Sequence, residues 1–79
     1  MRSMLYRNSG LNVRYYKLEI FLSLFGEYIV EREYGNVAYR APTGTRKNIF
    51  LSVESAKEFY FKTLKTRKNR GYKNDSHSA

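Results

Sequence analysis

The sequence contains no cysteine, and it has only one histidine, His77. Without cysteine, neither a disulfide framework nor a thiolate metal site can form. No run of about 18 apolar residues occurs, so we expect no transmembrane helix. The N-terminus lacks the apolar core of an export signal, which, like the missing cysteine, fits a cytoplasmic protein.

Motifs of catalysis are missing as well. The chain has no Gly-rich phosphate loop, no nucleophile elbow and no cluster of histidines at metal-binding spacing. His77 stands alone in a polar tail, where we expect neither metal binding nor general-base chemistry. Glu31 and Glu33 occupy alternate positions and could share a metal ion, but a solvated charged face is the simpler interpretation. We therefore predict a protein that is not an enzyme, with no catalytic residue, no metal and no cofactor.

Acidic residues are few, and the basic residues are concentrated in the second half of the chain, which makes the charge uneven. The formal net charge is +8. Residues 1–39 carry five basic and four acidic side chains, a balance of +1, whereas residues 40–79 carry ten basic and three acidic side chains, a balance of +7. Such asymmetry predicts a polyanionic partner, and we expect nucleic acid and no membrane. The charge does not distinguish DNA from RNA, and of the two we expect DNA. Charge that serves solubility alone and contact with an anionic membrane surface remain as alternative interpretations.

Alternation of apolar and polar residues predicts a small antiparallel sheet. In residues 13–22 one face carries Tyr16, Leu18, Ile20 and Leu22, and after a hairpin turn at 23–26 the next strand places Tyr28, Val30 and Tyr34 together. Residues 1–8 are expected to form a first strand, 37–40 the start of another, 41–45 a loop and 46–51 a further strand.

A helix is predicted over residues 53–70. Ser52 is a suitable N-cap, and Gly71 is placed as the residue that ends the helix in the left-handed conformation. Val53, Ala56, Tyr60 and Leu64 recur at helical spacing and form the stripe expected to be buried. Seventy-nine residues allow one domain with a thin core, so the predicted fold is α+β, a small sheet packed against one long C-terminal helix.

Several short motifs occur in a fixed order: Arg14-Tyr15-Tyr16-Lys17-Leu18, Leu24-Phe25-Gly26, Arg32-Glu33-Tyr34-Gly35-Asn36, Phe50, Ala56, and Arg67-Lys68-Asn69-Arg70-Gly71-Tyr72. Together they resemble the WGR domain, a small module named for its Trp-Gly-Arg motif, over about residues 12–73. The resemblance implies an antiparallel sheet on one long helix and binding of nucleic acid. We expect a single domain over 1–73 and a disordered polar tail over 74–79.

Two of the three name-giving residues differ here, because Tyr34 replaces the Trp and Asn36 replaces the Arg. In poly(ADP-ribose) polymerases the WGR Trp packs on the sugar of a terminal nucleotide. The resemblance therefore implies that Tyr34 stacks on the ligand and that Asn36 is a neutral hydrogen-bonding substitute. The alternative interpretation is that Tyr34 belongs to the core and that Gly35 and Asn36 only form a turn.

Basic residues of the loop and of the helix end are the remaining candidates for the interface. Lys and Arg displace the counterions of a phosphate backbone, and Arg can contact phosphate through two nitrogens. The candidates are Arg40, Arg46, Lys47, Lys65, Arg67, Lys68, Arg70 and Lys73. Those at the helix end also suit the helix dipole, so a solvated face is the alternative interpretation.

Two other functions fit the sequence. Small basic proteins built from a sheet and a helix include RNA-cleaving toxins, which use Lys, Arg, Tyr and Glu side chains, and all four types occur here. A protein-interaction module is the other alternative, because WGR domains also contact neighbouring domains of larger chains.

Overall fold

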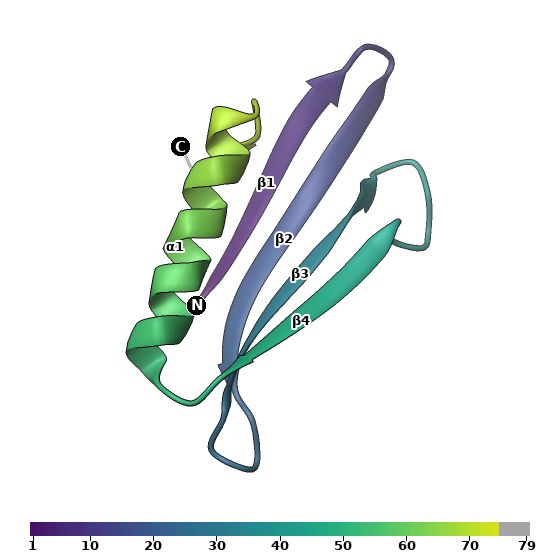
Figure 1. The fold of residues 1–79 in the computed structure, drawn as a ribbon. Helices are drawn as coiled ribbons and strands as arrows, with labels where there is room; N and C mark the ends of the chain where they lie inside the picture. Colours follow the sequence, from purple (N-terminus) through teal and green to yellow (C-terminus); the bar gives the residue numbers. More distant parts are fainter. Residues whose placement is uncertain (75–79) are drawn as a thin grey trace.

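The computed structural model describes residues 1–74, which form one sheet and one helix (Figure 1). The elements in chain order are β1 (Arg2–Ser9), β2 (Asn12–Leu22), β3 (Tyr28–Asn36), β4 (Gly44–Phe50), α1 (Val53–Asn69) and β5 (Lys73–Asn74). The sheet has the order β4-β3-β2-β1-β5, and every neighbouring pair of strands is antiparallel. The α+β fold, with the helix packed on one face of the sheet, is the predicted one.

Strand register divides the sheet into a helix-side face and an open face. Leu5 pairs with Tyr16, Tyr16 with Tyr34, and Tyr34 with Gly44, so this row of residues lies on one face. Since side chains alternate along a strand, Leu18 and Val30 lie on that same face, and both are fully buried. The predicted alternation in β2 and β3 is thereby confirmed.

The core lies between the helix-side face and α1. Its buried members are Leu5, Tyr16, Leu18, Val30, Ala56, Tyr60 and Tyr72. Three of these side chains are tyrosines, which supply large buried area in a short chain. The Tyr60 hydroxyl forms a hydrogen bond with the Ser3 hydroxyl, so this buried polar group is satisfied.

Both ends of α1 carry the caps that the sequence predicts. At the first turn, the Ser52 hydroxyl oxygen accepts a hydrogen bond from the Ser55 amide at 3.2 Å. At the last turn, Gly71 has a φ of 97°, and the amides of Gly71 and Tyr72 donate to the carbonyls of Lys68 and Arg67, each at 3.1 Å. These two hydrogen bonds end the helix and direct Tyr72 into the core.

Two predictions about local structure are wrong. Residues 37–40 do not begin a strand, because the Asn36 side chain and carbonyl turn the chain there, and β4 begins only at Gly44. Asn74, assigned to a disordered tail, instead pairs with Leu5 as part of β5. The rest of that predicted tail, residues 75–79, lies outside the described residues, as does His77.

Candidate nucleic-acid interface

Two stacked tyrosines lie on the helix-side face. The ring centroids of Tyr16 and Tyr34 are 6.0 Å apart, and their planes differ by 9°. Tyr16 is fully buried, whereas Tyr34 is only half-buried and packs against the edge of the core. The structure thus places Tyr34 at the border of core and solvent, where the ring packs against Tyr16 and part of the side chain stays accessible.

Gly44 provides the space in which the Tyr34 ring lies. The two residues are paired across β3 and β4. A Cβ atom at position 44 would lie 2.6 Å from Cζ of Tyr34 and 2.9 Å from Cε2, and both distances are shorter than van der Waals contact. Any side chain at this position would therefore push the Tyr34 ring away from its place.

Asn36 lies at the point where β3 ends. Its side chain is buried, and its Oδ1 atom accepts a hydrogen bond from the Ala38 amide at 2.9 Å. Its carbonyl oxygen accepts a second bond from the Tyr39 amide at 3.0 Å. An Asn side chain that bonds to the backbone two residues later is a turn-forming device, so Asn36 shapes the loop beside Tyr34.

Two arginines join the helix end to aromatic rings of the sheet. The Cζ atom of Arg67 lies 4.4 Å from the centroid of Tyr16, and that of Arg7 lies 5.1 Å from the centroid of Tyr72. Arg7 also donates from Nη1 to the Arg70 carbonyl at 3.2 Å. Cation–π contacts of this kind contribute about 0.5–2 kcal/mol each. The Nε atom of Arg67 is buried and has no hydrogen-bond partner in residues 1–74.

The acidic residues of the strands are confined to one face of the sheet, whereas the basic residues of the strands lie on both faces. The strand register places Arg7, Arg14, Arg32 and Arg46 on the helix-side face, to which α1 adds Arg67. The glutamates of the strands, Glu19, Glu31 and Glu33, all lie on the open face. The open face therefore combines its three glutamates with Arg2, Lys17, Lys47 and Lys73, whereas the strands give the helix-side face arginines and no carboxylate.

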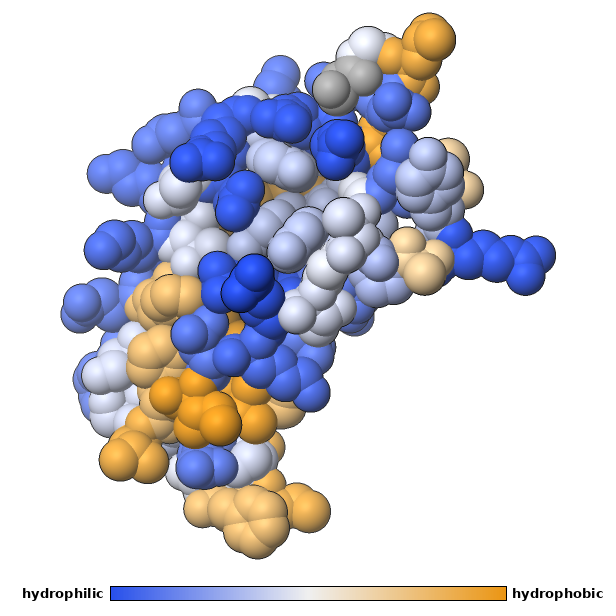
Figure 2. All heavy atoms as spheres, turned by 45° about the vertical axis from the view of Figure 1, so that its right-hand side comes forward, coloured by the Kyte–Doolittle hydropathy of each residue, from blue (hydrophilic) through white to orange (hydrophobic). Residues whose placement is uncertain are grey.

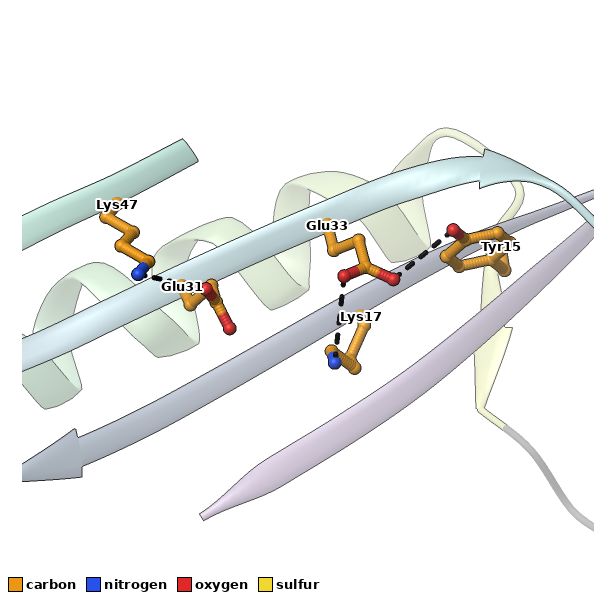
Figure 3. A network of polar contacts seen from close by, with 5 residues as sticks. All are labelled: Tyr15, Lys17, Glu31, Glu33 and Lys47. Atoms are coloured by element: carbon orange, nitrogen blue, oxygen red, sulfur yellow. Dashed lines mark hydrogen bonds and ion pairs between the residues drawn. The ribbon is translucent and has the colours of Figure 1, made fainter. Parts of the chain in front are cut away.

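Two of the three glutamates on the open face have partners on that same face (Figure 3). Glu33 accepts a hydrogen bond from the Tyr15 hydroxyl at 3.3 Å and lies 3.8 Å from Nζ of Lys17. Glu31 lies 3.6 Å from Nζ of Lys47. Burial raises the pKa of the Tyr15 phenol, and the negative charge and hydrogen bond of Glu33 raise it further, so Tyr15 is a neutral donor at physiological pH.

The structure brings some of the predicted interface residues together and separates others. Tyr34, Arg46 and Arg67 share the helix-side face. Lys65, Lys68 and Arg70 are exposed at the end of α1. Arg40 is exposed in the loop between β3 and β4. Lys47 and Lys73 lie on the open face, because Lys47 pairs with Glu31 across β3 and β4 and Lys73 pairs with Tyr6 across β1 and β5.

Arg7, Arg14 and Arg32 join the helix-side face although the sequence analysis did not select them. Arg32 lies opposite Arg46, donates from Nη2 to Asn48 at 3.0 Å and sits 5.3 Å from the Phe59 centroid. The signal for Arg32 was its spacing, because it is two residues from Tyr34 in an alternating strand. Arg14 had a similar signal, because it is two residues from Tyr16 in an alternating strand, whereas Arg7 had none.

Within residues 1–74, no three His, Cys, Asp or Glu side chains lie close enough together to hold a metal ion. In that same part of the chain, no helix has the length and apolar character needed to cross a bilayer.

Comparison with known families gives one result. The model of the family described as the WGR domain matches the whole chain, residues 1–79. Neither a curated protein nor a solved structure matches the chain.

Proposed function

This chain belongs to the WGR domain family, which is a family of nucleic-acid-binding modules, and from this premise we propose that it is a non-catalytic DNA-binding domain. The proposed ligand surface, called here the helix-side surface, consists of Tyr34, Arg7, Arg14, Arg32, Arg46, Arg67 and the exposed side chains Arg40, Lys65, Lys68 and Arg70. We also propose that the protein is located in the cytoplasm, where it would have access to DNA.

The confinement of the strand glutamates to the open face is the observation that carries this proposal. Net charge alone would also fit a protein that is basic only for solubility. A solubilising charge has no reason to place all three strand glutamates on one face, whereas a phosphate-binding surface is better without carboxylates. The helix carries Glu54 and Glu58, but both lie in its first half and not at its basic end. The three strand glutamates lie on the open face, where Lys17 and Lys47 pair with two of them.

Tyr34 is the proposed stacking residue at the centre of this surface. Its packed side rests on Tyr16, so little side-chain freedom remains to be lost when a ligand binds. An aromatic ring held in this way can stack on a base or a sugar of any sequence. Arginines around such a ring contact phosphates, which position the ligand without reading its sequence. We therefore propose weak sequence specificity and strong dependence on salt.

Lys47, Lys73 and Asn36 have other proposed roles. Lys47 and Lys73 lie on the open face, so they would add to long-range attraction and not to direct contact. Asn36 would hold the loop that carries Arg40, because its Oδ1 atom bonds to the Ala38 amide. The neutral residue at the position of the family's Arg would thus act through the shape of the loop.

Titration against four fluorescent ligands tests the proposal: single- and double-stranded DNA and RNA, each at about 50 and 200 mM salt. Contact with about four phosphates predicts a log–log salt slope near −3 to −4 on duplex DNA. Tighter binding to duplex DNA than to RNA is expected. Absence of binding at micromolar protein and about 50 mM salt would refute the function.

The same protein and RNA samples distinguish a ribonuclease from a non-catalytic binding domain. Single-stranded RNA is incubated with the protein in the presence of a metal chelator and analysed on a denaturing gel. We expect intact RNA, because the helix-side surface combines arginines with tyrosine and has no carboxylate from the strands to act as a base. Cleavage products that disappear with the Tyr34→Ala protein would assign a catalytic function instead.

A further inference from the structure

One end of the molecule carries large apolar side chains that the fold leaves in solvent. This apolar end consists of Phe21, Leu22, Leu24, Phe25, Ile49 and Leu51, from the β2–β3 hairpin and the end of β4. Leu24 is 100% exposed, Phe25 89% and Leu51 86%. Register brings the two segments together, because Phe21 pairs with Ile29 and Ile29 with Ile49. Figure 2 shows the hydrophobic side chains gathered at the lower end of the molecule.

The fold does not need apolar residues at the tip of this hairpin. The Ser23 hydroxyl oxygen accepts hydrogen bonds from the amides of Phe25 and Glu27, each at 3.2 Å. Gly26 has a φ of 82°, which closes the turn. Ser23 and Gly26 therefore determine the turn, and the side chains of Leu24 and Phe25 are free of any role in it.

The area of the apolar end exceeds that of an ordinary surface patch and comes close to what a dimer buries. Taking roughly 150–200 Å² for each fully exposed side chain of this size, the six residues at their observed exposures present on the order of 700 Å². The largest apolar patch of a typical monomer covers about 300–600 Å². A stable protein–protein interface buries about 800 Å² per partner.

Charge determines which partner suits this end. Residues 20–26 and 48–53, which contain all six side chains, include no ionisable residue. The basic half of α1 and the loop between β3 and β4 lie at the opposite end (Figure 1), and the longest dimension of the molecule is 42 Å. Two copies that meet through their apolar ends would keep these basic regions far beyond the Debye length of about 10 Å. Repulsion between two chains of +8 is then small.

From this arrangement, we propose that the apolar end is a self-association surface, on which a second copy of this chain docks about a two-fold axis. An apolar patch without charges is complementary to its own copy, which is what a two-fold interface requires. The dimer would direct its two helix-side surfaces outward from opposite ends. One consequence rests on the proposed function: each dimer would hold two DNA duplexes at once.

Sedimentation equilibrium without nucleic acid tests the dimer directly. The protein is measured from about 5 to 200 µM, and the expected mass at the upper concentrations is twice the chain mass of 9.4 kDa. The Leu24→Ser/Phe25→Ser variant is expected to stay monomeric, with at least about a hundredfold weaker association. Leu51→Ser, a second exposed position in the other segment, should weaken association about tenfold.

Leu11→Ser is the matched control. Leu11 is fully exposed in the turn between β1 and β2, away from the apolar end, so this variant should associate like the original protein. Far-ultraviolet circular dichroism confirms that each variant is folded. A protein that remains monomeric at 200 µM, or a double-serine variant that dimerises normally, would overturn the proposal.

A capture assay then separates this inference from the proposed function. An immobilised duplex should retain a second, fluorescent duplex with the original protein, but at least tenfold less with the double-serine variant. That variant should bind one duplex with an unchanged salt slope. If neither protein binds DNA while the dimer forms as described, the proposed function fails and the self-association surface stands.

Discussion

Replacement of Tyr34 by alanine separates the contribution of its ring to folding stability from its contribution to DNA binding. Truncation of a fully buried large aromatic costs about 3–5 kcal/mol of folding free energy. Tyr34 is half-buried, so we expect about 2 kcal/mol, including its stack on Tyr16. In a chain of this length that loss lowers Tm by roughly 8–16 °C. If the exposed side stacks on a nucleotide, DNA binding loses about 1–3 kcal/mol in addition.

Tyr28→Ala is the matched control for this experiment. Tyr28 is on the same strand and the same face, is also half-buried and packs against the same core, but lies at the hairpin end. The two variants should lose similar stability in thermal melts. In fluorescence anisotropy, at a temperature where both proteins are folded, only Tyr34→Ala should bind duplex DNA more weakly. Equal binding by the two variants would show that Tyr34 is a core residue only.

Four further perturbations follow from the geometry. Gly44→Ala should cost about 1–3 kcal/mol in urea unfolding and weaken DNA binding, because the new Cβ displaces the Tyr34 ring; normal affinity would show that the ring position is unimportant. Tyr34→Trp should fold and bind DNA at least as well in the same anisotropy assay, and a folded variant that binds worse would contradict the stacking role. Neutralising the exposed helix end by glutamine at Lys65, Lys68 and Arg70 should flatten the salt slope by about 0.9 per lost phosphate contact; an unchanged slope would leave these residues as a solvated face. Ser52→Ala should lower the unfolding free energy by about 1 kcal/mol without changing DNA affinity, since the cap lies at the hairpin end of α1.

Local signals were sufficient to predict most of the fold. The alternation from Tyr16 to Leu22 and from Tyr28 to Tyr34 gave the faces of β2 and β3, because period two is a property of the strand itself. Ser52 and Gly71 gave the helix bounds, because caps act through backbone groups within four residues. Residues 37–40 were misassigned because the side chain of Asn36 bonds to Ala38 and stops the strand. The two-residue β5 depends on Tyr72 being buried, which no local pattern shows.

The candidate interface was less accessible to sequence reasoning. Alternation implies that Arg46 and Lys47 lie on opposite faces, but it cannot say which of them shares a face with Tyr34. That depends on the register of β3 and β4, a contact between segments separated by a loop. Arg7 and Arg14 lie far from Arg46 and Arg67 in the sequence, and only the folded sheet brings them to the same side.

The central claim is that DNA meets the helix-side face, and charge-matched variants of the two faces test it most directly. Arg14→Gln/Arg46→Gln removes two exposed charges from the helix-side face, whereas Lys17→Gln/Lys47→Gln removes two from the open face. Both proteins have the same net charge, so long-range attraction to duplex DNA is reduced equally. The measurement is the duplex dissociation constant from about 50 to 300 mM salt.

We predict that the helix-side variant binds at least about tenfold more weakly near 100 mM salt, with a slope shallower by about 1.8 for two lost phosphate contacts. The open-face variant should keep the slope of the original protein. Equal losses in the two variants would contradict the account, because they would show that the protein attracts DNA through its net charge and not through the helix-side face.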